Sequence, residues 1–338
     1  MRLIKDEKDI YFGLRLAYII LAIFASYFVG SRSEDIGTDT GNYLYYFNAI
    51  SNSEKLDPGF DRIEIGFFWI TKIISLFTQS PSIYLAIIFM IQFVGITGPF
   101  FRRSELFDKY FLLSFVWLSY PFFYSITLNV LRQGVAFVFV IYAVDRYLCG
   151  ERKSAYLLAL TGVAFHYVTI IYFIAFLFGD LKIRTLLIFW LGCVFLAMTG
   201  AVGYFFTFLE KLMNSFGVND YYLSYFNGVM SSEYVTGFKP EFFLASITPI
   251  FCVYLFMWLG FDISKNNLRL LKIYIIINSL YFLFTELPYN DRFAIASWLF
   301  IPYIITNIIY NNLNTFFPFV VVVPFFAILL FYYQVIGL

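Results

Sequence analysis

Apolar stretches long enough to cross a bilayer recur along the whole chain. Residues 10–30, 83–101, 186–206 and 242–260 are examples. A helix needs about 20 mainly apolar residues to span the hydrocarbon core of a membrane. No polar region between these stretches is long enough to form a soluble domain. The pattern therefore predicts an all-α, polytopic integral membrane helix bundle, built as one domain over residues 1–338.

The amino-acid composition argues against several classes of function. The chain is 61% apolar and 13% charged, whereas a soluble domain carries about 25% charged residues. Its net charge of +1 and the absence of a long basic run give no support to nucleic-acid binding. One histidine and three scattered cysteines form no ordinary zinc site, and no glycine-rich phosphate loop occurs. We therefore expect no metal and no cofactor.

Positive charges predict the topology, because Lys and Arg concentrate in short cytoplasmic loops. Five basic clusters are assigned to the cytoplasmic side: Arg2/Lys5/Lys8, Arg102/Arg103/Lys109, Arg146/Arg152/Lys153, Lys182/Arg184 and Lys265/Arg269/Lys272. This assignment predicts about eleven spans, a cytoplasmic N-terminus and a retained first helix rather than a cleaved signal peptide. The spans are 10–30, 83–101, 109–126, 130–148, 153–165, 167–180, 184–205, 241–260, 268–287, 291–311 and 315–335.

Two longer segments are then expected on the extracytoplasmic side. Loop 1 covers residues 31–80, loop 2 covers residues 206–240, and both are expected to contain amphipathic helices. Within loop 1, the apolar segment 63–78 is short and has Lys72 in its middle. We predict that this segment is an amphipathic helix that lies at the membrane interface and does not cross it.

Polar residues on the outer face gather at turns. They lie in residues 32–43, 61–67, 129–133 and 286–292, and at His166, the only histidine. Ionisable residues near a membrane are costly and tend to mark function. We therefore expect these turns to converge on one outward-facing pocket.

The acidic residues and the histidine each have a structural and a functional interpretation. Asp39 precedes an aromatic-rich segment, where it could cap a helix or act on a substrate. Glu64 could sit in the first turn of its helix, favoured by the helix dipole, or act in the site. His166 interrupts two apolar runs, and a lone histidine is either a core residue or a proton-transfer group.

The arginines also have two interpretations. Arg132 opens the segment 130–148 with Gln133 beside it, and a helix start with an arginine suits an anion. Snorkelling to lipid headgroups is the alternative. Arg292 either contributes to a site or pairs with its neighbours Asp291 and Glu286.

Together these motifs resemble the EpsG/Wzy-type bacterial polysaccharide polymerases. The resemblance covers residues 30 to 300, and Ile65 departs from it, since many members have proline there. The matching residues are Arg32, Gly37-Thr38-Asp39-Thr40, Tyr43, Glu64-x-Gly66-Phe67, Asn129-x-x-Arg132-Gln133-Gly134-Val135-Ala136, Phe165-His166-Tyr167 and Arg292-Phe293.

The resemblance implies a metal-independent glycosyltransferase of the integral membrane kind, with a GT-C-like architecture. Its substrates would be oligosaccharide repeat units on undecaprenyl diphosphate, at the outer face of the bacterial cytoplasmic membrane. The growing glycan would pass from its lipid diphosphate to the non-reducing end of a new unit. A chain-length regulator and a flippase of the same pathway are the expected protein partners.

The reaction gives each residue an expected role. A departing lipid diphosphate builds negative charge, which guanidinium groups hold well, so Arg132, Arg292 and Arg32 are the expected diphosphate ligands. The acceptor hydroxyl needs a base, for which Asp39 and then His166 are the candidates, with Glu64 left open. Other substrate contacts are expected from Gln133, Tyr43 and Glu64. Sugar stacking is expected from Tyr43 and from aromatics of loop 2: Tyr221, Tyr222, Tyr225 and Phe226.

Two other functions compete with this one. A flippase for the same lipid-linked sugars would place charges near the bilayer midplane and often shows inverted repeats. Here the charges lie toward one face and no repeat is evident. A membrane ligase or acyltransferase acting on surface glycans would share the outward-facing site, and only the motif set above favours a polymerase over it.

Overall fold

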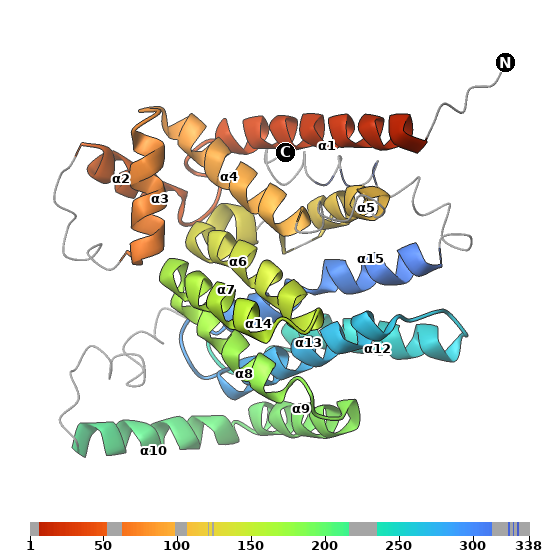
Figure 1. The fold of residues 1–338 in the computed structure, drawn as a ribbon. Helices are drawn as coiled ribbons and strands as arrows, with labels where there is room; N and C mark the ends of the chain where they lie inside the picture. The colour runs from red at the N-terminus through yellow and green to blue at the C-terminus, as the bar shows by residue number, and fades with distance from the viewer. Residues whose placement is uncertain are drawn as a thin grey trace. The chain divides into compact units, whose positions relative to one another are not determined.

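The structure is a computed structural model that describes residues 7–52, 63–98, 107–120, 122–123, 125–215 and 235–312, together with residues 324, 327 and 330 (Figure 1). Within these residues the regular structure is entirely helical, which confirms the predicted all-α class. The chain divides into two compact units. Unit 1 comprises Met1–Ile170 and Ile309–Leu338, and unit 2 comprises Ile171–Ile308.

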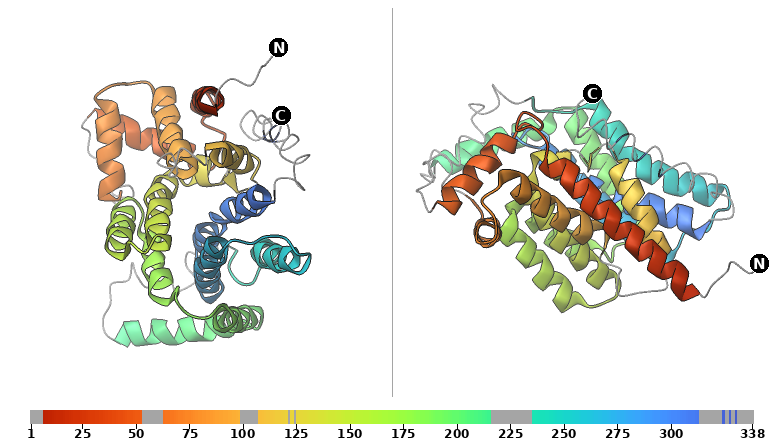
Figure 2. Two further views of the ribbon diagram at one scale, coloured as in Figure 1. Left: turned by 45° about the vertical axis from the view of Figure 1, so that its right-hand side comes forward. Right: turned by 90° about the horizontal axis from the view of Figure 1, so that it is seen from above.

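Unit 1 is built around helices that pack side by side. Helix α1 lies along α4, and α6 packs against both α7 and α4 (Figures 1 and 2). Helix α4 begins sharply because Ser80 accepts a hydrogen bond from the Ile83 amide and proline stands in its first turn. The elements are α1 (Glu7–Gly30), α2 (Thr40–Ser51), α3 (Ile65–Ser75), α4 (Pro81–Thr97), α5 (Phe107–Leu118), η2 (Ser125–Asn129, a π-helical turn), α6 (Leu131–Leu148), α7 (Arg152–Phe165) and η3 (Tyr167–Ile170).

Helices α2 and α3 form the part of loop 1 that carries site residues. Helix α3 has 11 residues and is therefore about 16 Å long, too short to span a membrane. The ammonium group of Lys72 in α3 donates to the Ile50 carbonyl at the end of α2, over 2.9 Å. Lys72 thus holds the two helices together and satisfies a carbonyl of the last turn of α2. These bounds agree with the short helix predicted over 63–78.

Unit 2 is centred on α13, which packs against α8, α9 and α14. Ser264 caps α13 by accepting a hydrogen bond from the Asn267 amide. The elements are α8 (Ile171–Phe178), α9 (Ile183–Met198), α10 (Ala201–Ser215), α12 (Pro240–Trp258), α13 (Lys265–Leu283), α14 (Asp291–Trp298) and α15 (Ile301–Asn311), of which residues up to Ile308 belong to this unit.

A buried neutral network joins four helices of unit 2 through Asn278 in α13. The Asn278 carboxamide nitrogen donates to the hydroxyls of Ser246 and Ser297, each over 2.9 Å, and its oxygen accepts from the Trp190 indole over 2.7 Å. Trp298 donates to the Ser246 hydroxyl and Tyr274 to the Ser246 carbonyl. We call these six residues the Asn278 network. Its members are at most 2% exposed, so the network fixes how the helices meet inside an apolar bundle.

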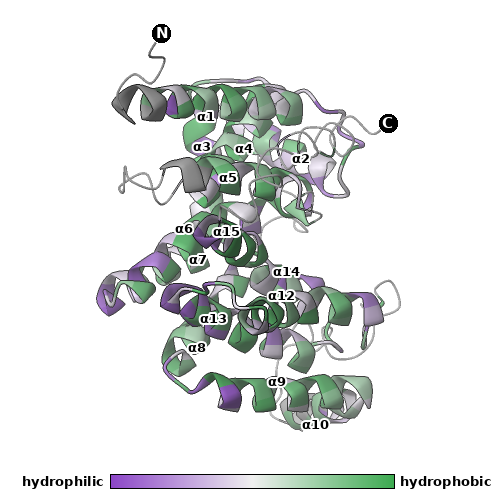
Figure 3. Ribbon diagram, turned by 90° about the vertical axis from the view of Figure 1, so that its right-hand side faces the viewer, coloured by the Kyte–Doolittle hydropathy of each residue, from purple (hydrophilic) through white to green (hydrophobic). Residues whose placement is uncertain are grey.

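Length and hydropathy identify three helices able to cross a membrane among the described residues: Phe12–Gly30, Pro240–Trp258 and Asp291–Asn311. A fourth span results if the bent pair Ile183–Met198 and Ala201–Phe208 is counted as one. Most residues of α1, α9 and α12 are hydrophobic (Figure 3). The chain is therefore a membrane protein, and the predicted eleven spans stay a prediction.

Two predicted helices differ from the structure. The predicted span 184–205 is two helices that meet at 82°, because α9 ends at Met198 and is followed by Gly200, whose φ of +69° suits a residue without a side chain. The predicted helix 109–126 ends at Leu118 and is followed by η2. Helix α10 continues to Ser215, within the range 206–240 for which loop 2 and its amphipathic helices are predicted.

Other predicted features lie outside the described residues. These are residues 216–234 of loop 2, with Tyr221, Tyr222, Tyr225 and Phe226, and most of the predicted last span 315–335.

Candidate functional site

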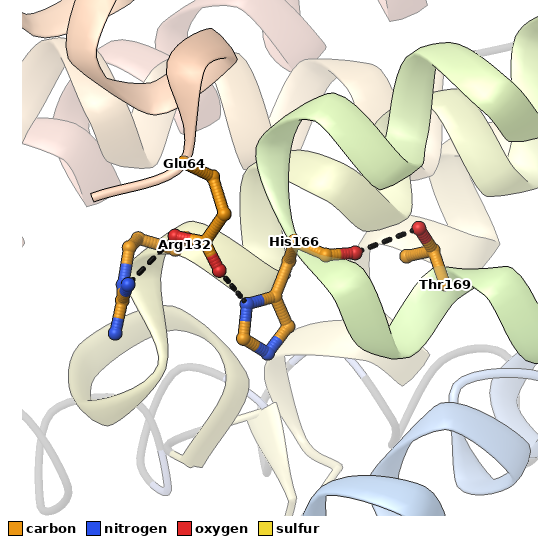
Figure 4. A network of polar contacts seen from close by, with 4 residues as sticks. All are labelled: Glu64, Arg132, His166 and Thr169. Atoms are coloured by element: carbon orange, nitrogen blue, oxygen red, sulfur yellow. Dashed lines mark hydrogen bonds and ion pairs between the residues drawn. The ribbon is translucent and has the colours of Figure 1, made fainter. Parts of the chain in front are cut away.

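Glu64 is the residue around which the site forms. It stands immediately before α3 in an extended conformation, and its side chain does not cap that helix. One carboxylate oxygen instead accepts a hydrogen bond from the Arg132 guanidinium at 2.6 Å, and the other lies 2.7 Å from Nδ1 of His166 (Figure 4). Glu64 is 3% exposed. A favourable interaction with the helix dipole therefore does not fully explain Glu64, because its carboxylate binds two side chains from other elements.

Arg132 is the member of this cluster nearest to the surface. It lies in the first turn of α6, just after the π-helical turn η2, and its side chain is 21% exposed. The guanidinium also interacts with the Tyr43 side chain of α2. Its Nε is buried without a hydrogen-bond partner among the described residues. Because the guanidinium has five N–H donors, pairing with Glu64 leaves it capacity for an anionic ligand.

His166 is held rigidly between α7 and η3. Its amide donates to the Gly162 carbonyl, and its own carbonyl accepts from the hydroxyl and the amide of Thr169. The residue is 6% exposed. Because an ionised carboxylate only accepts hydrogen bonds, the Nδ1 atom facing Glu64 carries the proton. In the neutral ring the lone pair then lies on Nε2, which points to the side away from the carboxylate (Figure 4).

Gly66 explains the spacing of the Glu64-x-Gly66 motif. A side chain at this position would place its first carbon 2.8 Å from both the Ala164 carbonyl oxygen and the Phe165 ring. Helix α3 can therefore approach the end of α7 only because Gly66 has no side chain. This close approach puts Glu64 within hydrogen-bonding distance of His166, the residue that follows Phe165.

The segment before α2 is attached to the start of α6. Gly37 has a φ of +93°, which favours glycine, and the next amide, that of Thr38, donates to the Asn129 side chain over 3.0 Å. Asn129 ends η2, two residues before α6 begins. This hydrogen bond holds Asp39 and Arg132 in the same part of unit 1.

Asp39 stands at the cap position of α2, but its side chain makes no capping hydrogen bond. Its carboxylate acts electrostatically on the hydroxyl of Tyr46, as do Arg132 and Glu64. The capping interpretation of Asp39 is therefore not supported, and its carboxylate belongs with the cluster.

Two residues of this region were missed from the sequence. Tyr46 lies within the field of three charged residues of the cluster. Gln92 of α4 is fully buried and donates to the Leu131 carbonyl over 3.0 Å, while Gly134 leaves room for its carboxamide. Gln92 thus fixes the first turn of α6, where Arg132 and the buried Gln133 lie. A single glutamine inside an apolar stretch is a signal that could have identified it.

Two predicted diphosphate ligands have other surroundings. Arg32 is 8% exposed and donates to the Val29 carbonyl and the Thr40 hydroxyl, so it braces the turn between α1 and α2. Arg292 belongs to unit 2, where its guanidinium lies 4.6 Å from the centre of the Tyr289 ring. Among the predicted residues, the structure therefore brings together Tyr43, Glu64, Arg132 and His166, and Asp39 acts on Tyr46 together with Glu64 and Arg132.

The surroundings of Glu64 favour its ionised form. Burial raises the pKa of this carboxyl, but the hydrogen bond from His166 and the positive charge of Arg132 outweigh burial, so the net pKa lies below its ordinary value. Burial raises the pKa of the Tyr46 hydroxyl, which the nearby Arg132 only partly offsets. The cluster therefore holds a carboxylate and a guanidinium in their charged forms.

The described residues contain no group of three His, Cys, Asp or Glu side chains arranged to hold a metal ion. What the site offers is a positioned imidazole, a guanidinium with spare donors and nearby tyrosines. This combination can accept a proton from a hydroxyl group and hold an anionic leaving group.

Comparison with models of known protein families gives a match over nearly the whole chain. The model of the EpsG family matches residues 15–337. No curated protein and no solved structure matches.

Proposed function

The chain belongs to the EpsG family, and from this premise we propose that it is a polysaccharide polymerase that joins lipid-linked oligosaccharide repeat units. Membership indicates a polymerase-type function in polysaccharide synthesis. The finer proposal is that the repeat units are carried on undecaprenyl diphosphate and joined at the outer face of the cytoplasmic membrane. The contact of Glu64 with both Arg132 and His166 is the observation that carries it.

In the proposed reaction, a hydroxyl of the incoming unit attacks the anomeric carbon of the growing glycan. The bond from that carbon to the diphosphate oxygen breaks, the new glycosidic bond forms, and the hydroxyl proton passes to a base. Nε2 of His166 is the proposed base, because Glu64 fixes the proton on Nδ1 and stabilises the imidazolium that results. Asp39 is the second candidate.

Charge balance supports the same assignment. Before reaction, the negative charge of Glu64 offsets the positive charge of Arg132, and His166 is neutral. Proton uptake by His166 then adds one positive charge at the moment when the diphosphate leaves. Arg132, through the donors that Glu64 does not use, is placed to hold the diphosphate oxygens. The site would thus become cationic when an anion needs stabilisation, without a metal ion.

The test is chain extension by the purified protein in liposomes, with lipid-linked repeat units isolated from cells that make the polymer. Arg132→Ala should reduce the rate of extension by about 100-fold or more, because it removes a preorganised electrostatic contact. Arg146→Ala is the matched control: Arg146 lies in the same helix and pairs with the exposed Glu151. This variant should extend chains at the wild-type rate.

Two outcomes would overturn the proposal. One is extension by Arg132→Ala at the rate of Arg146→Ala. The other is movement of the lipid-linked units across the bilayer without extension by the wild-type protein, which would instead support a transporter.

A further inference from the structure

A second polar site lies in unit 2, at the turn between α13 and α14. Its first element is Glu286, a partly buried carboxylate that makes no hydrogen bond or ion pair with any other described residue. The backbones of Gly203 and Gly237 approach it, and a methyl group on either would lie within 3.8 Å of its carboxyl group. The Glu286 carboxyl group therefore lies next to two glycines, and no cation among the described residues pairs with it.

The second element is Asn290, which is fully buried. Its carboxamide nitrogen donates to the Thr285 carbonyl over 2.6 Å, while its oxygen has no partner among the described residues. The Thr285 carbonyl also accepts from the amide of Gly237 over 2.8 Å. Asn290 and Glu286 are thus both fixed around Gly237, and a buried acceptor without a partner is rare enough in proteins to need an explanation.

The backbone of the turn is itself unusual. Tyr289 has a φ of +58°, and it is the single non-glycine residue with a positive φ among those described. Strained conformations of this kind cluster at functional sites, where the surrounding structure maintains them. The Tyr289 ring is also partly exposed under the Arg292 guanidinium. The turn therefore combines two hydrogen-bond acceptors with an aromatic ring.

We propose that this turn binds a sugar unit of the glycan, with the Glu286 carboxyl and the Asn290 carboxamide oxygen accepting hydrogen bonds from sugar hydroxyls. This proposal rests on the proposed function, which supplies the glycan. Hydrogen-bond acceptors would repel an anion, and the described residues form no group of three acidic, histidine or cysteine side chains that could hold a metal ion here. A sugar supplies neutral donors for both oxygens and an apolar face for an aromatic ring.

Desolvation of Glu286 fits a neutral ligand. Burial raises the pKa of this carboxyl above its ordinary value, and no neighbouring cation opposes the shift. Sugar hydroxyls would give this incompletely solvated carboxyl group the hydrogen-bond donors that burial takes from it.

The test measures binding and not extension. Its probe is a sized oligosaccharide obtained by partial hydrolysis of the polymer from producing cells, titrated into the full-length protein in nanodiscs by calorimetry. Glu286→Ala should weaken binding by about tenfold or more, the loss expected for a hydrogen bond to a charged or strongly polar group. Glu286→Gln, which keeps one acceptor oxygen and the size of the side chain, should weaken it less. Glu241→Ala, which removes an exposed carboxylate in the same unit, is the matched control and should bind as wild type.

Arg132→Ala separates this proposal from the polymerase proposal, because it should bind the oligosaccharide normally while failing to extend chains. Four results would overturn the sugar site. These are wild-type affinity in Glu286→Ala, no binding by the wild-type protein, loss of binding in Arg132→Ala, and binding that EDTA abolishes and a divalent cation restores. If Glu286→Ala does not fold, wild-type affinity in Glu286→Gln at several pH values is the overturning result.

Discussion

The Glu64 cluster of unit 1 and the Asn278 network of unit 2 bury polar groups in opposite ways. In unit 1, Glu64, Arg132 and His166 form a charged cluster with two short contacts, and Arg132 is 21% exposed and has a buried Nε without a partner among the described residues. In unit 2, the Asn278 network is neutral and at most 2% exposed, and its central carboxamide uses its oxygen and both hydrogens.

This difference suggests that the Glu64 cluster serves to bind a ligand and that the Asn278 network serves to hold the helices together. A network whose hydrogen bonds are complete has no free donor or acceptor for a ligand, but it stabilises one arrangement of helices over others. A charged cluster that keeps spare donors is costly to bury and is retained where those donors are used. We therefore expect changes in the Glu64 cluster to affect activity more than stability, and changes in the Asn278 network to do the reverse.

The largest expected effect is that of His166→Asn on chain extension. Asparagine preserves a polar side chain of similar reach but cannot take up a proton at neutral pH. The rate of extension should fall by about 100- to 10,000-fold, the usual contribution of a general base, while the protein still inserts into membranes and unfolds cooperatively. Initial rates in liposomes measure this effect.

Asp39→Asn provides the comparison for that experiment. If His166→Asn extends chains within a few-fold of the wild-type rate and Asp39→Asn does not, the base is Asp39. The Glu64–His166 contact would then be a structural link and not part of the reaction.

The next effect concerns the other region. Asn278→Leu would remove the hydrogen bonds that Asn278 makes with the Trp190 indole and with the hydroxyls of Ser246 and Ser297, which should cost about 3 kcal/mol of unfolding free energy. Extension per folded molecule should stay near the wild-type value. Denaturant unfolding in detergent and extension at a low temperature measure the two quantities. Asn266→Leu, at an exposed position of the same helix, should change neither.

Much of the fold could be predicted from the sequence, because hydropathy records which segments are apolar. The short helix after Glu64 and the paired short helices around His166 have nearly the predicted bounds. The break at Gly200 could not be predicted, since a glycine inside an apolar stretch is also tolerated in a continuous helix. The sharp bend there depends on a local left-handed conformation that hydropathy does not encode.

Individual site residues could be chosen from the sequence, but their pairing could not. Arg132 and His166 lie 68 and 102 positions from Glu64, and only tertiary packing shows that one carboxylate contacts both of them. Tyr46 and Gln92 were missed for the same reason. Tyr46 looks like an ordinary helix residue until the charges around it are known, and the polarity of Gln92 inside an apolar stretch does not by itself reveal its contact with α6.

A smaller effect should follow from changing the contact that positions Glu64 and leaving its charge intact. In Gly66→Ala, the added carbon would overlap the Ala164 carbonyl and the Phe165 ring, so α3 or the end of α7 must shift. Overpacking of this kind typically costs about 1–3 kcal/mol, and extension should fall as Glu64 moves from His166. Gly41→Ala is the matched control in α2, because an added carbon there meets no atom within 4 Å. Equal rates and unfolding midpoints in the two variants would show that the close approach has no role.

The smallest effect is the dependence of stability on pH in the Glu64 cluster. Because the pKa of Glu64 in the folded protein lies below its ordinary value of 4.5, its ionised form adds stability above that value. This contribution should disappear as the pH falls through the lowered pKa. The unfolding midpoint of the wild-type protein should therefore exceed that of Glu64→Gln near neutral pH, and the difference should shrink as the solution is acidified. The Asn278 network contains no group that titrates in this range, so Asn278→Leu should keep the acid-side slope of the wild-type protein. A wild-type advantage over Glu64→Gln that grows on acidification would mean that Glu64 is protonated in the folded state. In that case the charged cluster would resemble the neutral network of unit 2, and the contrast between the two regions would lose its electrostatic basis.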